Sequence, residues 1–285
     1  MTSTLLLPTL AEISIVGKAM AVSSPLRPAD FPGWEDSLKK HGPKLTSALT
    51  VNRQKQNDCN ADSAGTGSEA RQFFVEGKID EKARTYLYNA CEYVTSPNNV
   101  GRDQGTSIQS AVIVQTQGIK SLGVKSGMPL ESDYPYGTYE RSSSRFAERA
   151  KGAVMQDVFI SEHGPAPTID ELPLHCAVGG IVHFGVFWGV RFTSQVIDGK
   201  TYKVWSSVSN SGGGHALEVV TCLWLQNSWW PAVWNSHGDG LILMPREIYM
   251  TYARKQFGPF GGYGIRPDKP AERFHDRRQS GGGYV

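Results

Sequence analysis

Hydrophobic residues in the first half of the chain recur every three or four positions, which is the period of an amphipathic helix. One such stripe predicts a helix over residues 81–93, and another predicts a helix over 107–122. A third helix is predicted over 62–76, although Gly65 and Gly67 each cost about 1 kcal/mol of helix stability relative to alanine. Two glycines so close together indicate a helix packed tightly against its neighbours, as a central helix between two lobes would be.

The second half of the chain has a different pattern. Thr168-Ile169-Asp170-Glu171 is a capping box that opens a short helix. Runs of β-branched and aromatic residues, separated by Gly and Asn, then predict strands over 181–190, 201–208, 215–225 and 241–244. Helices followed by strands favour an α+β fold with a helical lobe and a sheet lobe.

Prolines and glycines mark the two ends of the chain. Residues 1–50 carry five prolines and few periodic apolar positions, which predicts an extended N-terminal arm. Residues 261–285 are rich in Gly, Pro and charge, as is typical of a mobile tail. The folded domain is therefore expected over 51–260, mainly helical over 51–150 and mainly β over 151–260.

Composition argues against several classes of function. The net charge of +2, with scattered Lys and Arg, gives no basic surface for nucleic acid. No apolar run reaches the roughly 18 residues of a membrane span, and the short apolar stretch over 4–10 lacks the basic residues of a signal peptide. The four cysteines form no Cys-x-x-Cys pair and are expected to be mostly reduced thiols. We therefore expect a soluble protein, made in the cytoplasm, with no cofactor and no metal.

Three separated segments resemble the active site of papain-like cysteine peptidases and occur in that family's order. They are Gln56-Asn57-Asp58-Cys59-Asn60-Ala61-Asp62, Gly213-Gly214-His215-Ala216 and Asn227-Ser228-Trp229. An acidic residue before Tyr134-Pro135-Tyr136 extends the resemblance, and the segments 86–90 and 103–108 are similar to the bacterial and viral branch. The resemblance implies a papain-like two-lobed fold, in which a helical lobe precedes an antiparallel, barrel-like sheet lobe.

The resemblance also implies a role for each candidate residue. His215 would carry a proton, and Asn227 would orient its imidazole. Gln56 would donate to an oxyanion, and Trp229 would shield the histidine–asparagine bond from water. Plainer interpretations stay open, namely a surface glutamine, a strand-edge histidine and a tryptophan cluster in the core.

Asp62 stands where the resemblance places the nucleophilic cysteine. A carboxylate cannot replace a thiolate in attack on an amide, and Ser63 replaces the aromatic residue that often follows the nucleophile. At a helix start, an ionised Asp62 would be stabilised by the helix dipole and could pair with His215. Cys59 is an alternative thiol, but it is displaced by three residues, and a misplacement of ~1 Å already costs about 10²-fold in rate.

The carboxylate at position 62 favours a catalytically inactive papain-like protein, a pseudopeptidase with a structural or binding role. The arm, the tail and the bacterial and viral resemblance favour a component of a larger assembly, such as a bacteriophage virion or tail. Its partners would be other protein subunits, with a peptide-like ligand in the cleft. Two enzymatic alternatives stay open: a cysteine peptidase that uses Cys59, and a non-peptide hydrolase that uses Asp62 and His215 as an acid/base pair.

Overall fold

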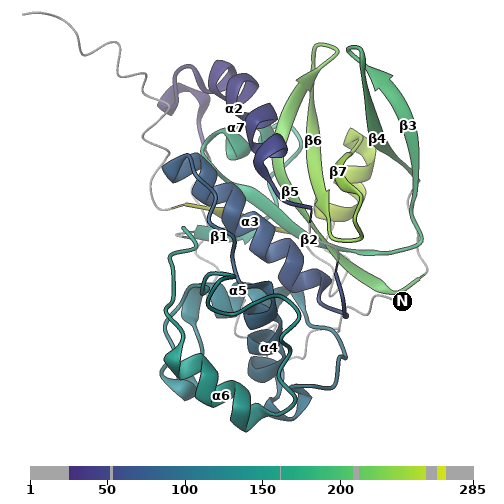
Figure 1. Cartoon of the computed structure of the whole chain (residues 1–285). Coiled ribbons are helices and arrows are strands. Elements are labelled where there is room, and N and C mark those ends of the chain that lie inside the picture. Colours follow the sequence, from purple (N-terminus) through teal and green to yellow (C-terminus); the bar gives the residue numbers. More distant parts are fainter. Residues whose placement is uncertain (1–25, 52–53, 161, 208–211, 255–261, 268–285) are drawn as a thin grey trace, which may run out of the picture.

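The computed structural model describes residues 26–51, 54–160, 162–207, 212–254 and 262–267. These residues form a helical lobe and a sheet lobe that lie against each other (Figure 1). One large buried cluster fills the helical lobe, and another lies between the sheet and the helices that cover it. The expected α+β architecture with two lobes is confirmed. Among the described helices, none combines the length and the apolar character needed to cross a bilayer.

The helical lobe contains the elements that the first half of the sequence predicts. They are α3 (Cys59–Glu76), α4 (Arg84–Thr95), α5 (Ile108–Gln117) and α6 (Ser143–Gly152), with short 3₁₀ turns at Pro97–Asn99 and Lys120–Leu122. The helix predicted over 81–93 begins later, because Lys82 pairs with Leu130 in an isolated β-bridge. The helix predicted over 107–122 ends earlier, because Gly118 has a φ of 67° and stops it.

Helix α3 is the central element that the two glycines indicated. A Cβ added at Gly67 would lie 2.8 Å from Cδ of Glu218 in the sheet, and one at Gly65 would lie 3.0 Å from Cγ of Arg84. The predicted start at Asp62 is wrong, since the helix begins at Cys59. The helix therefore begins nearly one turn earlier than predicted, and the first helical residue is Cys59 instead of Asp62.

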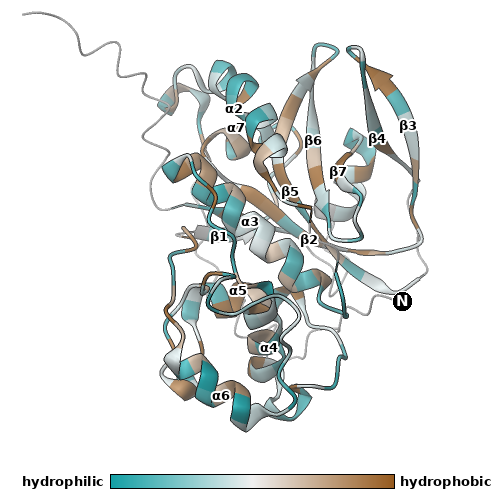
Figure 2. Cartoon of the chain, viewed as in Figure 1, coloured by the Kyte–Doolittle hydropathy of each residue, from teal (hydrophilic) through white to brown (hydrophobic). Residues whose placement is uncertain are grey.

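The sheet lobe contains one eight-stranded sheet in the order β1-β8-β2-β5-β6-β7-β4-β3. Its strands are β1 (Glu162–Pro165), β2 (Ile181–Phe187), β3 (Arg191–Ile197), β4 (Lys200–Ser207), β5 (Gly214–Leu225), β6 (Ser228–Asn235), β7 (Gly240–Leu243) and β8 (Tyr263–Arg266). All neighbouring pairs are antiparallel except β4 and β7. The sequence pattern predicted β2, β4, β5 and β7, and Figure 2 shows apolar (brown) stretches along β2 and β5.

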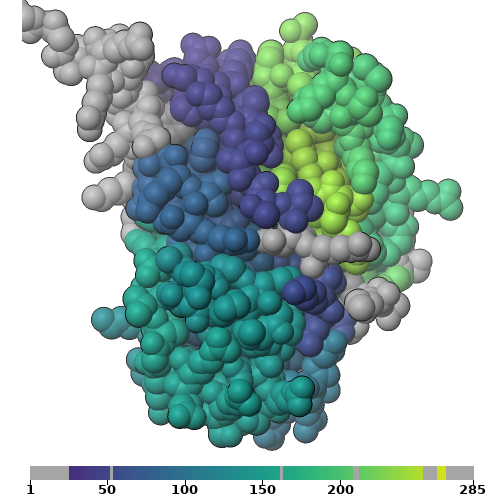
Figure 3. Space-filling view, viewed as in Figure 1, coloured from purple at the N-terminus to yellow at the C-terminus, as the bar shows by residue number. Residues whose placement is uncertain are grey.

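The prediction of an extended arm over residues 1–50 is wrong for residues 34–48, which form a helix. A short 3₁₀ turn (Pro28–Asp30) is followed by helix α2 (Trp34–Ala48), which buries Leu38, Gly42 and Leu45. Pro43 removes one hydrogen bond from the helix but does not end it. Figure 3 shows α2 (purple) packed beside the green strands above the helical lobe. Residues 1–25 lie outside the described residues.

Two further predictions concern the rest of the sheet lobe. The capping box forms, because the hydroxyl and the backbone N–H of Thr168 both donate to Glu171 Oε2, ahead of α7 (Leu172–Ala177). The tail predicted over 261–285 begins too early, since β8 pairs with both β1 and β2. The lobe is completed by α8 (Arg246–Tyr249) and a π-helical turn (Met250–Arg254). The four cysteines remain thiols, as expected.

Replacing Gly42 with alanine is expected to lower the free energy of unfolding by about 1–3 kcal/mol, because the new Cβ overpacks the contact between α2 and β5. That Cβ would lie 2.9 Å from the carbonyl oxygen of Cys222. Gly152 is the matched control, since it is also helical and a Cβ there meets nothing within 4 Å. Urea denaturation followed by circular dichroism measures both. Equal stability of the two variants would mean that α2 does not pack this closely on the sheet.

Candidate active site

His215 lies near the start of β5, and its side chain is fully buried. Its Nε2 lies 2.9 Å from Oδ1 of Asn235, the last residue of β6. Nδ2 of Asn235 donates to Oδ2 of Asp239 at 2.8 Å. A carboxylate can only accept, so this second bond fixes the orientation of the amide. Oδ1 therefore faces the imidazole, and Nε2 of His215 carries the proton.

The predicted partner Asn227 does not reach His215. It lies in the turn between β5 and β6, with a φ of 58°, and it is exposed. Strand β5 runs from Gly214 to Leu225, so at about 3.4 Å per residue its two ends are roughly 37 Å apart. Because β6 pairs antiparallel with β5, it returns the chain to His215 at Asn235. The expectation for Asn227 is therefore wrong.

The predicted shielding residue Trp229 also lies at the far end of the hairpin. Its ring packs 6.0 Å from that of Trp34 and 5.0 Å from that of Trp224. The indole beside the imidazole is that of Trp188, which follows β2 and lies 4.2 Å from the ring of His215. Trp188 also stacks on His237 at 4.9 Å with an interplanar angle of 13°. The predicted shielding role thus falls to a tryptophan that the sequence motif did not contain.

His237 is a second imidazole in the site, and the sequence analysis missed it. Its Nε2 lies 3.2 Å from Nδ1 of His215. Since Nε2 of His215 carries the proton, Nδ1 accepts, and His237 must donate. Burial, and then the charge of His237, lower the pKa of His215 to about 3. The resting imidazole of His215 is therefore neutral at physiological pH.

Cys59 occupies the first position of α3. Its side chain is 1% exposed and belongs to a small buried cluster with Ile108 and Ala216, against which Phe187 packs. Ala216 directly follows His215 in β5. The first turn of a helix directs backbone N–H groups and the positive end of the dipole toward its N-terminus, where they favour a thiolate. The structure thus gives Cys59 the helix-start position that the sequence analysis gave to Asp62.

A buried polar network holds this end of α3 against the sheet. Oδ1 of Asn60 lies 2.8 Å from Nε2 of His183, whose Nδ1 lies 2.8 Å from Oε2 of Glu218. The hydroxyl of Ser63 lies 3.2 Å from the same Nδ1 and 3.3 Å from the same carboxylate oxygen. The network joins the residue after Cys59 to β2 and β5, and it thereby holds the start of α3 on the sheet.

Asp62 is the fourth residue of α3, in its first turn, and is 2% exposed. Its Oδ1 lies 3.2 Å from Nε of Arg84, whose Nη2 also bonds Oε2 of Glu69 at 2.9 Å. Burial raises the pKa of Asp62 most, and Asp58 raises it further, against the lowering effect of Arg84. Asp62 thus belongs to an ion-pair network, and it also lines a small pocket with Ser236, so its expected role as the position of a lost nucleophile stays a prediction.

Gln56 is not attached to the histidine side of the site. Its backbone oxygen accepts from Nε2 of Gln54, two residues earlier. It is Gln54 that is joined to the segment after Asn235: its Oε1 accepts from the hydroxyl of Ser236 at 2.8 Å, and its backbone N–H donates to the carbonyl of Ser236 at 3.0 Å. Gln54 is therefore the better candidate for a side-chain amide near the reacting atoms.

Solved structures identify the fold, whereas no protein-family model and no curated protein matches the chain. The bromelain protease from Ananas comosus has a TM-score of 0.54 at 13% identity, over 82% of this chain and 97% of that one. The proform of the ragweed pollen cysteine protease Amb a 11 has a TM-score of 0.53 at 16% identity, over 80% of this chain. A procathepsin B from Trypanosoma congolense has a TM-score of 0.52 at 14% identity, over 82% of this chain and 76% of that one.

At these identities the likeness is one of fold. The chain has the papain-like two-lobed fold, as the resemblance implied. It spans 64% of the length of the ragweed proform.

Proposed function

We propose that this protein is a cysteine-dependent hydrolase of peptide bonds. Cys59 is the nucleophile, His215 the proton carrier and Asn235 the residue that orients the imidazole. The observation that carries the proposal is the position of Cys59, which begins α3 and packs on Ala216, the residue that follows His215 in β5, while Nε2 of His215 is held at 2.9 Å from Asn235. These are the parts that thiol-based acyl transfer requires, on a fold that cysteine proteases share.

In the proposed reaction, the Cys59 thiol gives its proton to Nδ1 of His215, and the thiolate sulfur attacks the peptide carbonyl carbon. The tetrahedral intermediate collapses when the C–N bond breaks, and the imidazolium protonates the departing amine. Water then hydrolyses the thioester and regenerates the thiol. Since Nδ1 of His215 now accepts from His237, that contact has to break before the proton moves.

Two groups are placed to stabilise the oxyanion of this intermediate. The N-terminal end of α3 presents backbone N–H groups and a positive dipole end. The side-chain amide of Gln54 lies near the same end of the sheet, because it is attached to Ser236. The role of Gln56 as an oxyanion donor stays a prediction beside them.

An inactive protein with a structural or binding role is the second candidate, and burial is the observation that favours it. Cys59 is 1% exposed and His215 0%, so a peptide reaches neither side chain unless the covering groups move. The low pKa of His215 also disfavours a thiolate–imidazolium pair in the resting site.

Partner subunits and a bacteriophage virion stay predictions, since the arm and tail that motivated them lie mostly outside the described residues. An Asp62/His215 acid/base pair has no such support, because Asp62 is committed to Arg84.

The test compares two asparagines. Asn235→Ala should lower kcat/KM for a fluorogenic peptide amide by about 10²-fold or more, because the imidazole of His215 loses its orienting acceptor. Asn227→Ala, in the exposed turn of the same hairpin, should leave kcat/KM unchanged. If both variants keep full activity, the histidine–asparagine pair has no role. If the unmodified chain turns over no peptide and resists an epoxysuccinyl inhibitor, the inactive candidate is correct.

A further inference from the structure

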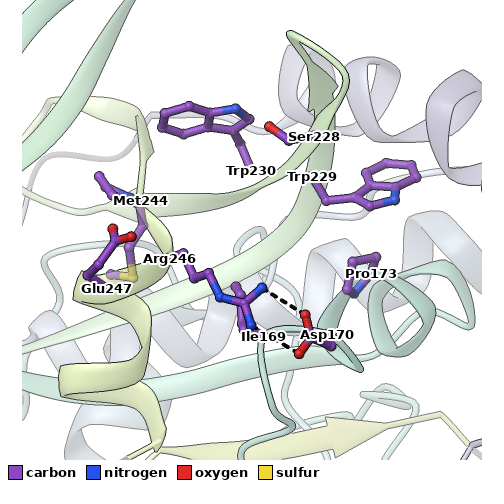
Figure 4. Close-up of a pocket in the computed structure, with 10 residues that line it drawn as sticks. Ile169, Asp170, Pro173, Ser228, Trp229, Trp230, Met244, Arg246 and Glu247 are labelled. Atoms are coloured by element: carbon purple, nitrogen blue, oxygen red, sulfur yellow. Dashed lines mark hydrogen bonds and ion pairs between the residues drawn. The ribbon is translucent and has the colours of Figure 1, made fainter.

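A pocket of about 400 Å³ opens on the sheet lobe, between the start of β6, the segment before α7, and α8 (Figure 4). It is separate from the candidate active site. Trp229 stands six residues before Asn235 on β6, which at about 3.4 Å per residue corresponds to roughly 20 Å. Its volume falls within the range of about 300–1,000 Å³ that small-molecule sites occupy.

The walls of the pocket are aromatic and aliphatic. The indoles of Trp229 and Trp230 stand on its two sides, and the side chains of Ile169, Pro173 and Met244 complete the apolar surface (Figure 4). Neither tryptophan is fully buried. Flat, amphipathic indole rings of this kind offer a large apolar face together with an N–H group.

The rim of the pocket is polar and charged. Nη1 and Nη2 of Arg246 bond the two carboxylate oxygens of Asp170 at 2.7 and 3.0 Å. Glu247 and Ser228 add a carboxylate and a hydroxyl. Two carboxylates against one guanidinium leave the rim with one net negative charge, which disfavours phosphates, carboxylates and other anions.

These features define the chemistry of the ligand. It must present apolar C–H faces to the indoles and, at its edge, groups that both donate to carboxylates and accept from a guanidinium. Hydroxyl groups on a pyranose ring do both, and the ring itself supplies the C–H faces. We propose that this pocket binds a neutral saccharide, which rests against Trp229 and Trp230 and exchanges hydrogen bonds with Arg246 and Glu247.

The experiment uses the full chain and three neutral trisaccharides: maltotriose, cellotriose and triacetylchitotriose. Intrinsic tryptophan fluorescence and titration calorimetry should show saturable binding of at least one, with a Kd of about 1 mM or tighter. Trp229→Ala and Arg246→Ala should each weaken that binding by about tenfold or more, which corresponds to about 1.4 kcal/mol. Arg246 lies on the surface, with its side chain 58% exposed, so its loss does not threaten the fold.

Arg27→Ala is the matched control, because this arginine is 77% exposed and also pairs with an aspartate, Asp30, but does not line the pocket. Saccharide binding should survive that change. The proposal is overturned if none of the three sugars binds up to about ten times that concentration, or if binding is unaffected by both pocket variants. It is also overturned if the pocket instead takes a short tryptophan- and proline-containing peptide and no sugar.

Discussion

Cys59→Ala should abolish peptide hydrolysis, with kcat/KM reduced by about 10⁴-fold or more, because no other thiol can take its place in covalent catalysis. The residue begins α3, where the helix dipole favours the thiolate, and it lies beside the strand that carries His215. The measurement is the initial rate of hydrolysis of a peptide amide, together with mass spectrometry after treatment with an epoxysuccinyl inhibitor. One inhibitor molecule should attach to Cys59 of the unmodified chain and none to the variant.

Cys91→Ala is the matched control for the loss of a buried thiol. Cys91 is 0% exposed in α4, in the core of the helical lobe, and has no place in the proposed reaction. This variant should keep both turnover and labelling at Cys59. Full activity in Cys59→Ala, or labelling of Cys176 or Cys222 in its place, would refute the assignment of the nucleophile.

The sequence predicted the order and type of the site residues better than their positions. His215 was identified correctly as the histidine of a strand, since a long β-patterned run follows it. Its asparagine was not, because two Asn–Ser pairs follow His215 in the sequence, at 227 and at 235. Only the length of β5 and its antiparallel pairing with β6 decide between them, and pairing register is a property of tertiary structure.

The proposed nucleophile differs from the predicted position for a related reason. A spacing of six residues from Gln56 selected Asp62, whereas helix α3 begins three residues before that position. Helix boundaries are the least certain part of a prediction from periodicity. In the structure the N-cap residue of α3 is Asp58, and its side chain makes no capping hydrogen bond. Counted from the observed helix start, Cys59 holds the first helical position, which the prediction had given to residue 62.

His237 and Asp239 could not have been assigned from the pattern alone. Their roles depend on hydrogen bonds that cross between strands and turns, namely Asp239 to Asn235 and His237 to His215. They follow directly after the second Asn–Ser pair, so a correct choice of asparagine would have drawn attention to them. Helix α2 was missed because prolines dominate its surroundings, although Leu38, Gly42 and Leu45 carry a helical period.

Asp62→Ala should lower the free energy of unfolding by about 1–3 kcal/mol, because it removes one buried partner of Arg84. Arg84 is 1% exposed, and its guanidinium would keep Glu69 as a partner but lose the carboxylate 3.2 Å from its Nε. Urea denaturation measures the loss. Asp30→Ala is the control, since the pair of Asp30 with Arg27 lies on the surface and is expected to contribute about 0–1 kcal/mol.

Asp62→Cys separates the two assignments of the nucleophile. If Cys59 is the reacting thiol, a cysteine at 62 should be as destabilising as alanine and should take up no epoxysuccinyl inhibitor, because it lies in the first turn of α3 beside a buried guanidinium. Combining it with Cys59→Ala should therefore restore nothing. An inhibitor-reactive, hydrolytic Asp62→Cys/Cys59→Ala variant would place the reaction at residue 62 and return Asp62 to the role of a lost nucleophile. The loss of stability and the absence of reactivity expected for Asp62→Cys have one cause, because the carboxylate of Asp62 is the buried partner of Arg84.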